Sequence, residues 1–210
     1  MSKGASVARK RVRAPGRPLG FNPVKALDKA LRVFWQRGYE GASLAELTRS
    51  MGINRPSMYA AFGNKEELFR KALGRYEELV GGQLFETLGE PTARGAMERL
   101  LNGGAEGLSR SGQPHGCILV QGALACGAES RGVQRELAAR RGAQEEMIRE
   151  RLLRAKAEGD LPVHADPEEL ASYFTAVLHG MSVQAAGGAR REKLLGIAQR
   201  AMRAWPTAEG

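Results

Sequence analysis

The residues whose types and spacing most clearly suggest a binding function lie in one short stretch of the chain, between residues 43 and 65. Arg55 and Tyr59 are four apart, so in a helix they share one face. Pro56, Ser57 and Ala60 lie beside them, and the resulting face is polar and slim. Such a face fits the major groove of B-DNA, which is about 12 Å wide. An ordinary amphipathic helix with a solvated tyrosine has the same spacing, so spacing alone leaves both interpretations open.

Two short helices joined by a tight turn would have to position these residues. Ser43 followed by Glu46 is a capping-box pattern and predicts a helix start. Gly52 can end this helix because glycine adopts the left-handed conformation at little cost. Asn54 then caps a second helix, and Gly63 ends it. Two helices of this size around a glycine-containing turn predict a helix-turn-helix.

The charge distribution favours the DNA-binding interpretation. The chain has 32 Lys and Arg against 23 Asp and Glu, a net charge of +9. Residues 1–62 hold 12 basic and 3 acidic side chains, and residues 63–210 hold 20 of each. The whole excess therefore lies in the segment that contains the helix-turn-helix, as expected for a phosphate-binding surface.

Length and composition set the class of protein. A chain of 210 residues, 42% hydrophobic and 26% charged, can form one or two globular domains. No run reaches the roughly 18 to 20 apolar residues needed to span a bilayer, and the basic start is not followed by the apolar segment of a secretory signal. We therefore expect a cytoplasmic protein.

Residues 1–20 are predicted to form a disordered basic arm, because they contain six basic side chains and no acidic one. Arg17 lies in a Gly-Arg-Pro sequence, and with Arg13 it could reach into a minor groove. A solubilising tail that adds only nonspecific attraction to DNA is the alternative.

The rest of the chain is predicted to be helical, with no strand pattern and no internal repeat. Asn22 with Pro23 starts a first helix that Gly38 ends. Further helices are expected near residues 65–80, 92–108, 117–125, 132–157, 167–186 and 190–204. The predicted fold is all-α, with a three-helix helix-turn-helix domain at residues 21–66 and a larger helical domain at residues 67–210.

The segment from Met51 to Phe69, MGINRPSMYAAFGNKEELF, resembles the signature of TetR/AcrR-type transcriptional regulators. These regulators show a small residue, a hydrophobic-Tyr pair, a Phe and then Lys-Glu-Glu-Leu. The run from Gly38 to Leu44 is similar to their link between the first two helices. The resemblance covers about a quarter of the chain. One departure is Ala61, where many relatives have a polar or aromatic residue that contacts phosphate.

The resemblance implies a homodimeric repressor that binds a pseudo-palindromic operator and is released by a small-molecule effector in the larger domain. By motif position, Ser43, Tyr59 and Lys65 would bind phosphates. Arg55, Ser57 and Ala60 would face base edges. A dimer is also expected because one short helix contacts only a few base pairs. Two subunits related by two-fold symmetry would read two half-sites and so recognise a longer sequence.

The last two helices are the expected dimer interface. One apolar stripe consists of Leu170, Phe174, Val177 and Met181, and the other of Leu194, Ala198, Ala201 and Trp205. Three small residues, Ala171, Ala176 and Gly180, would allow close approach of the helices. Packing of both stripes inside one subunit is the alternative.

Helices between residues 92 and 186 are expected to enclose the effector cavity. The candidate ligand-binding residues are Cys117, Gln121, Phe174 and His179, of which His179 could also be an ordinary core histidine. Cys117 and Cys126 would lie more than two turns apart on one helix, too far for a disulfide.

A thiol sensor at Cys117 is an alternative, with Arg110, Arg131 and His115 as groups that could lower its pKa. His115, Cys117 and His164 lack the compact spacing of a metal site, so neither a metal nor a cofactor is expected. We find no P-loop, dinucleotide fingerprint, nucleophile elbow or zincin motif, and an enzyme is not expected. A nonspecific architectural DNA binder that uses the basic arm is the remaining rival, and it would show no preference for one palindrome.

Overall fold

The structure is a computed structural model that describes residues 20–207. Within this range the regular structure is entirely helical, which confirms the all-α prediction. Of the basic arm predicted at residues 1–20, residues 1–19, which include Arg13 and Arg17, lie outside the described residues. The helices are α1 (Pro23–Gly41), α2 (Leu44–Met51), α3 (Arg55–Phe62), α4 (Lys65–Leu88), α5 (Ala93–Leu108), α6 (Ile118–Gln121), α7 (Arg131–Glu158), α8 (Pro167–Ala186) and α9 (Arg191–Ala201), with 3-10 turns at Ala128–Ser130 and Met202–Ala204. No helix of this part of the chain is long and apolar enough to cross a membrane.

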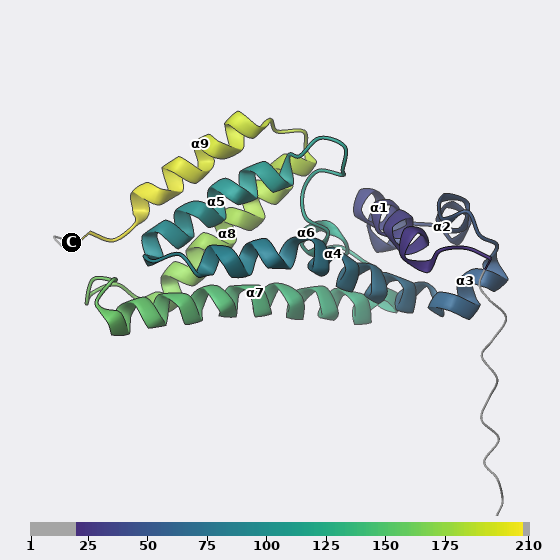
Figure 1. Cartoon of the computed structure of the whole chain (residues 1–210), viewed down its shortest axis with the longest axis horizontal. Coiled ribbons are helices and arrows are strands. Elements are labelled where there is room, and N and C mark those ends of the chain that lie inside the picture. The colour runs from purple at the N-terminus through teal and green to yellow at the C-terminus, as the bar shows by residue number, and fades with distance from the viewer. Residues whose placement is uncertain (1–19, 208–210) are drawn as a thin grey trace, which may run out of the picture.

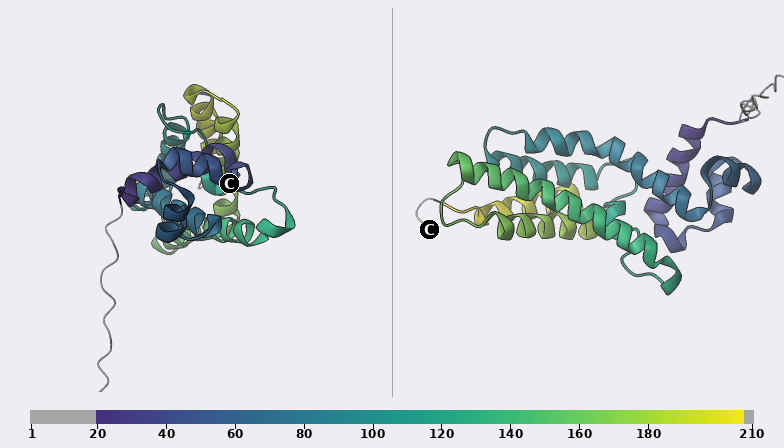
Figure 2. Two further views of the ribbon diagram at one scale, coloured as in Figure 1. Left: turned by 90° about the vertical axis from the view of Figure 1, so that its right-hand side faces the viewer. Right: turned by 90° about the horizontal axis from the view of Figure 1, so that it is seen from below.

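The molecule is elongated, with α1, α2 and α3 gathered at one end (Figure 1). Helix α4 leads away from this unit, and the long α7 runs beside it along the body. Helices α5, α8 and α9 complete the other end. The view from below shows the same separation of the small helical unit from the body (Figure 2).

The small unit has a core of aromatic and aliphatic side chains that α4 completes. Phe34 of α1 meets Phe69 of α4 edge to face, with ring centroids 4.9 Å apart. Met58 of α3 is fully buried in the same cluster. Ile118 and Leu137 also belong to it, so α6 and α7 pack directly under the helix-turn-helix unit.

The second core lies between α5, α7, α8 and α9. It contains the two apolar stripes that we expected at the dimer interface, so that part of the prediction was wrong. Phe174 and Met181 of α8 are fully buried in it, as is Leu194 of α9. Phe174 lies 5.9 Å from Trp205, ring centroid to ring centroid. These stripes therefore pack inside one subunit, because α5 supplies the apolar surface that covers them.

The opposite face of α8 is left uncovered by this packing. It carries Tyr173, which is 39% exposed, and Val183, which is 52% exposed. Ala176 and Gly180 are exposed between them. Ala171, the third small residue expected at the interface, is buried in the subunit core.

Helix α4 is longer than predicted. It continues through Gly81 and Gly82 to Leu88, eight residues past the expected end at Val80. Leu88 is buried in the second core. Each glycine in a helix costs about 1 kcal/mol relative to alanine. Tertiary packing of the last turns of α4 therefore outweighs the cost of the two glycines.

Helix α6 is shorter than predicted, with four residues instead of nine. The carbonyl of Gly122 accepts a hydrogen bond from the backbone N–H of Tyr39 at 2.7 Å, outside the helical pattern. Cys117 and Cys126 consequently do not share a helix, contrary to our expectation, and both are free thiols.

Candidate nucleic-acid interface and ligand cavity

The N-caps predicted for α2 and α3 are confirmed, but the reciprocal half of the Ser43–Glu46 capping box is not formed, because the Glu46 carboxylate pairs with Arg37. The Ser43 hydroxyl accepts a hydrogen bond from the Glu46 backbone N–H at 3.1 Å, and the Asn54 side chain accepts one from the Ser57 N–H at 2.8 Å. Gly52 has a φ of 73°, and its N–H donates to the Thr48 carbonyl. Three residues thus separate two capped helices, which is the geometry of a helix-turn-helix.

Helix α3 divides into a buried and an open face. Its Met58 and Phe62 are buried against the first core. Arg55, Pro56 and Ala60 are exposed, and Tyr59 is 46% exposed. Ser57 is half-buried on the same helix, and Arg55 forms no ion pair with any residue in the range 20–207. The open face is therefore available to a macromolecule.

The two remaining phosphate-binding candidates differ in their availability. Ser43 is exposed, and because its oxygen accepts the capping hydrogen bond, its hydroxyl proton stays free to be donated. The Lys65 ammonium lies over the Tyr39 ring, 4.6 Å from the centroid. Burial lowers the pKa of Lys65, and the nearby Glu40 carboxylate opposes this shift. Lys65 is therefore already engaged in a contact within the subunit.

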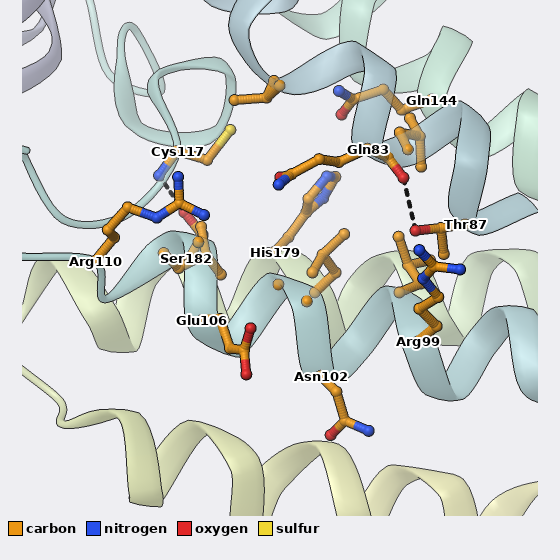
Figure 3. A pocket seen from close by; sticks show the side chains of 18 of the residues that line it. Gln83, Thr87, Arg99, Asn102, Glu106, Arg110, Cys117, Gln144, His179 and Ser182 are labelled. Atoms are coloured by element: carbon orange, nitrogen blue, oxygen red, sulfur yellow. Dashed lines mark hydrogen bonds between the residues drawn. The ribbon is translucent and has the colours of Figure 1, made fainter.

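A cavity of about 850 Å³ opens between α4, α5, α7 and α8 (Figure 3). Its apolar wall includes Leu84, Ile148 and Leu178. On α5 the wall contains Gly103 and Gly107, where an added Cβ would meet no atom within 4 Å. A glycine inside a helix is destabilising by roughly 0.5 to 1 kcal/mol relative to alanine. These glycines leave space in the cavity and do not serve helix packing.

The structure brings two of the four candidate ligand residues to this cavity. Cys117 and His179 line it, and Figure 3 shows both beside it. Gln121 lies outside the lining, and its amide donates to the His115 carbonyl at 3.2 Å. Phe174 is fully buried among core residues. A sequence pattern cannot separate a residue facing a cavity from one facing the core, since both lie on the inner side of a helix.

Cys117 is held as a structural thiol. The Tyr76 hydroxyl donates to its Sγ at 3.2 Å, and its backbone N–H donates to the Ser182 hydroxyl at 2.8 Å. Burial raises the pKa of Cys117, and the opposing effect of the Arg141 charge is smaller. The pKa therefore moves away from that of a reactive thiolate.

The cations proposed from the sequence do not activate this thiol. The charge that acts on Cys117 comes from Arg141, not from Arg110, Arg131 or His115. No cluster of metal-ligating side chains is found within residues 20–207.

Helix α1 is connected directly to the segment that carries Cys117. The buried Trp35 indole N–H donates to the Gly116 carbonyl at 3.1 Å, and the Arg32 guanidinium donates to the Gly112 carbonyl at 2.9 Å. Trp35 also lines the cavity together with Tyr76, and their rings meet edge to face at 4.8 Å. The cavity and the helix-turn-helix unit thus share side chains. The sequence did not reveal this, because Trp35 and Tyr76 lie on ordinary apolar stripes.

Comparison with known proteins agrees with both halves of this arrangement. The model of the family described as "Bacterial regulatory proteins, tetR family" matches residues 26–72. A second model, "Tetracyclin repressor-like, C-terminal domain", matches residues 94–205. The chain belongs to the TetR family of transcriptional regulators.

Relatives within the TetR family match over nearly the whole chain. The HTH-type transcriptional repressor ComR of Escherichia coli K12 is 35% identical over 195 residues, covering 91% of this chain and 92% of ComR. A solved structure of a cysteine mutant of the TetR family regulator CifR, in complex with 26-bp operator DNA, is 46% identical with a TM-score of 0.88. It covers 90% of this chain and 100% of the CifR chain. A TetR regulator from Rhodococcus sp. RHA1 is 42% identical, with a TM-score of 0.60 and coverage of 87% and 98%.

Proposed function

We propose that this TetR-family protein is a ligand-responsive transcriptional repressor that binds a pseudo-palindromic operator as a homodimer. The observation that carries the proposal is the open face of α3, held outward by two side-chain caps and a glycine turn. A small-molecule effector in the helical cavity would release the DNA. The protein would act in the cytoplasm, where bacterial operators lie, and without catalysing a reaction.

The expected contacts on DNA are of two kinds: contacts to phosphates, which position the protein, and contacts to base edges, which recognise the sequence. Ser43, Tyr59 and Lys65 would bind phosphates, which fixes the register of the protein on the duplex. Arg55 and Ser57 would meet base edges in the major groove, with Pro56 and Ala60 packing beside them. Lys65 would have to leave the ring of Tyr39, at least in part, to reach a phosphate. Arg13 and Arg17 would add contacts from the basic arm.

The similar proteins support this reading. ComR is named as a repressor, and the CifR structure contains operator DNA. Both match this chain over its helix-turn-helix and its larger helical region alike. We accordingly keep residues 21–66 as the DNA-binding domain and residues 67–210 as the ligand-binding and dimerisation domain.

A second copy of the chain would dock on the outward face of α8 together with α9. Ala176 and Gly180 are small and exposed, so two copies of α8 could approach closely. Tyr173 and Val183 supply apolar area on either side. A two-fold axis through this face would present two α3 helices to successive major grooves.

Ligand response would use the side chains that the cavity shares with α1. Trp35 and Tyr76 line the cavity, and Trp35 is hydrogen-bonded to Gly116. A ligand shifts the equilibrium only if it binds the DNA-free arrangement more tightly than the DNA-bound one. Displacing Trp35 would change the position of α1, and with it that of α3.

The test is a titration of the purified protein with operator-length duplexes at about 50 and 200 mM salt. We expect binding of one dimer to a palindromic site from the flanking region of its own gene, at least about 1,000-fold tighter than to a shuffled duplex. An architectural DNA binder would bind both duplexes equally. A protein that ignores every duplex at low salt would contradict the proposal.

A further inference from the structure

Part of the cavity wall consists of apolar side chains that are buried in the subunit. Trp35 and Tyr76 line it, and both side chains are almost completely buried. Leu84, Ile148 and Leu178 line other parts of it. A ligand that fills this space would bury mostly carbon surface, which favours an apolar molecule.

The charged side chains of the lining are mostly neutralised by neighbours. Arg99 forms an ion pair with Glu90. Glu106 forms one with Arg191 of α9 at 2.5 Å. Three further charged lining residues, Glu86, Glu98 and Arg110, are exposed, and two of the three are acidic. The cavity therefore offers no buried, unpaired charge of either sign to a ligand.

Uncharged polar side chains enter the same space from several helices. Gln83 comes from α4, Gln144 from α7 and His179 from α8, whereas Asn102 of α5, a fourth lining residue, points away from these three in Figure 3. None of the four side chains has a hydrogen-bond partner within residues 20–207. Gln144, Asn102 and His179 are half-buried, and Gln83 is exposed. These groups can both donate and accept hydrogen bonds as long as the imidazole is neutral.

The imidazole of His179 is kept neutral by its surroundings. Burial lowers the pKa of His179, and the positive charge of Arg141 lowers it further. The carboxylate of Glu145 acts in the opposite direction with a smaller effect. At neutral pH the ring therefore presents one donor nitrogen and one acceptor nitrogen.

We propose that the effector is an uncharged, largely apolar molecule whose polar end is hydrogen-bonded by Gln83, Gln144 and His179. This inference rests on the proposed function, since it names the class of ligand for the same cavity. A neutral amide, alcohol, ester or ketone would replace its bonds to water with bonds to these side chains. A carboxylate would lose its hydration without gaining a buried cation from the lining, which is unfavourable. The half-buried Arg141, whose charge acts on His179, lies outside the lining and donates to the Leu119 carbonyl.

A matched pair of probes separates charge from shape. Octanamide and octanoate have the same chain and nearly the same head group, but only octanoate is charged at pH 8. Binding to the DNA-free dimer is measured by calorimetry, and release of operator DNA is measured in a second titration of the protein–operator complex. We expect the dissociation constant of octanamide to be at least about tenfold lower than that of octanoate.

Two substitutions test the residues that we assign. Gln144→Leu keeps the size of the side chain and removes its hydrogen bonds, so it should weaken octanamide about tenfold and leave octanoate unchanged. Gln134→Leu on the same helix is the matched control, because Gln134 lies outside the cavity lining and donates to the Leu124 carbonyl. It should leave octanamide binding unchanged.

A third variant tests the space itself. Gly107→Leu would fill the cavity from α5, where an added Cβ meets nothing within 4 Å. We expect the melting temperature to be kept or raised while octanamide binding is lost. If the variant does not fold, Gly107→Ala provides the same comparison with a smaller loss.

Three results would overturn the inference. They are octanoate binding as tightly as octanamide, no binding of octanamide, and octanoate binding that Arg110→Ala abolishes, which would reveal an anion site at the mouth. Each is read on DNA-free protein. A protein that binds octanamide but no operator would contradict the proposed function and leave the ligand class standing.

Discussion

Arg55 and Tyr59 lie one turn apart on α3 and are both exposed, yet they would act on DNA in different ways. A guanidinium can donate two hydrogen bonds to the O6 and N7 atoms of one guanine, which distinguishes base pairs. A phenol hydroxyl donates a single hydrogen bond, and phosphate oxygens offer the same acceptor at every step. Sequence preference should therefore depend on Arg55, while Tyr59 should set overall affinity.

Arg55→Ala is expected to reduce discrimination between the operator and single-base variants by about 1 to 3 kcal/mol. Tyr59→Phe should weaken all duplexes by a similar factor, because only a phosphate contact is lost. The measurement is a titration of each protein against a panel of operator variants. If Arg55→Ala keeps both affinity and preference, α3 is not the reading helix.

The N-terminal caps determine where helices α4 and α5 begin. Asn64 and Glu67 form a reciprocal capping box at the start of α4, with hydrogen bonds of 2.9 and 2.8 Å. Thr92 caps α5 in the body, accepting from the Gly95 N–H at 3.1 Å. The two caps have comparable chemistry, but only the first adjoins α3.

Asn64→Ala and Thr92→Ala should each reduce the free energy of unfolding by about 0.5 to 2 kcal/mol. Only Asn64→Ala should also weaken operator binding, because fraying of the first turn of α4 displaces Lys65. Denaturant titration and operator titration of both variants measure the two effects. Equal operator affinity in the two variants would show that the α4 terminus does not contribute to the DNA surface.

The elements that differ from their predicted bounds are those whose neighbours are distant in sequence. Helix α4 runs past two glycines because its last turns pack into the second core. Helix α6 ends early because the carbonyl of Gly122 bonds to Tyr39, more than 80 residues away. Gly38, which has a φ of 69°, permits this approach, since an added Cβ would lie 3.1 Å from the Gly122 carbonyl oxygen. Local periodicity carries no information on such contacts.

In the whole molecule, the amino-acid sequence does not distinguish the apolar surface of α8 that forms the subunit core from the one that contacts a second copy. Both faces of α8 carry apolar residues, and the subunit core takes Phe174 and Met181. The face with Tyr173 and Val183 stays open, and it is the one assigned to the second copy.

Val183→Glu should raise the dissociation constant of the dimer about 100-fold, because two like charges would meet near the two-fold axis. Operator affinity should fall in parallel, while the helical content and the monomer fold should be kept. Phe85→Glu is the control, since Phe85 is 75% exposed on α4, and α4 packs mainly against α1, α5 and α7. Analytical ultracentrifugation gives the dissociation constants. An unchanged dimer in Val183→Glu would place the interface elsewhere.

The sequence by itself determined the helix-turn-helix, its caps and the outward position of Arg55 and Tyr59. These features depend on side chains within a few residues of each other, whose spacing the sequence states directly. Only the tertiary structure decided which stripe of α8 is core, which residues line the cavity and how Trp35 joins the cavity to α1. These features depend on contacts between helices far apart in the chain, and an apolar residue carries no mark of which neighbour will cover it.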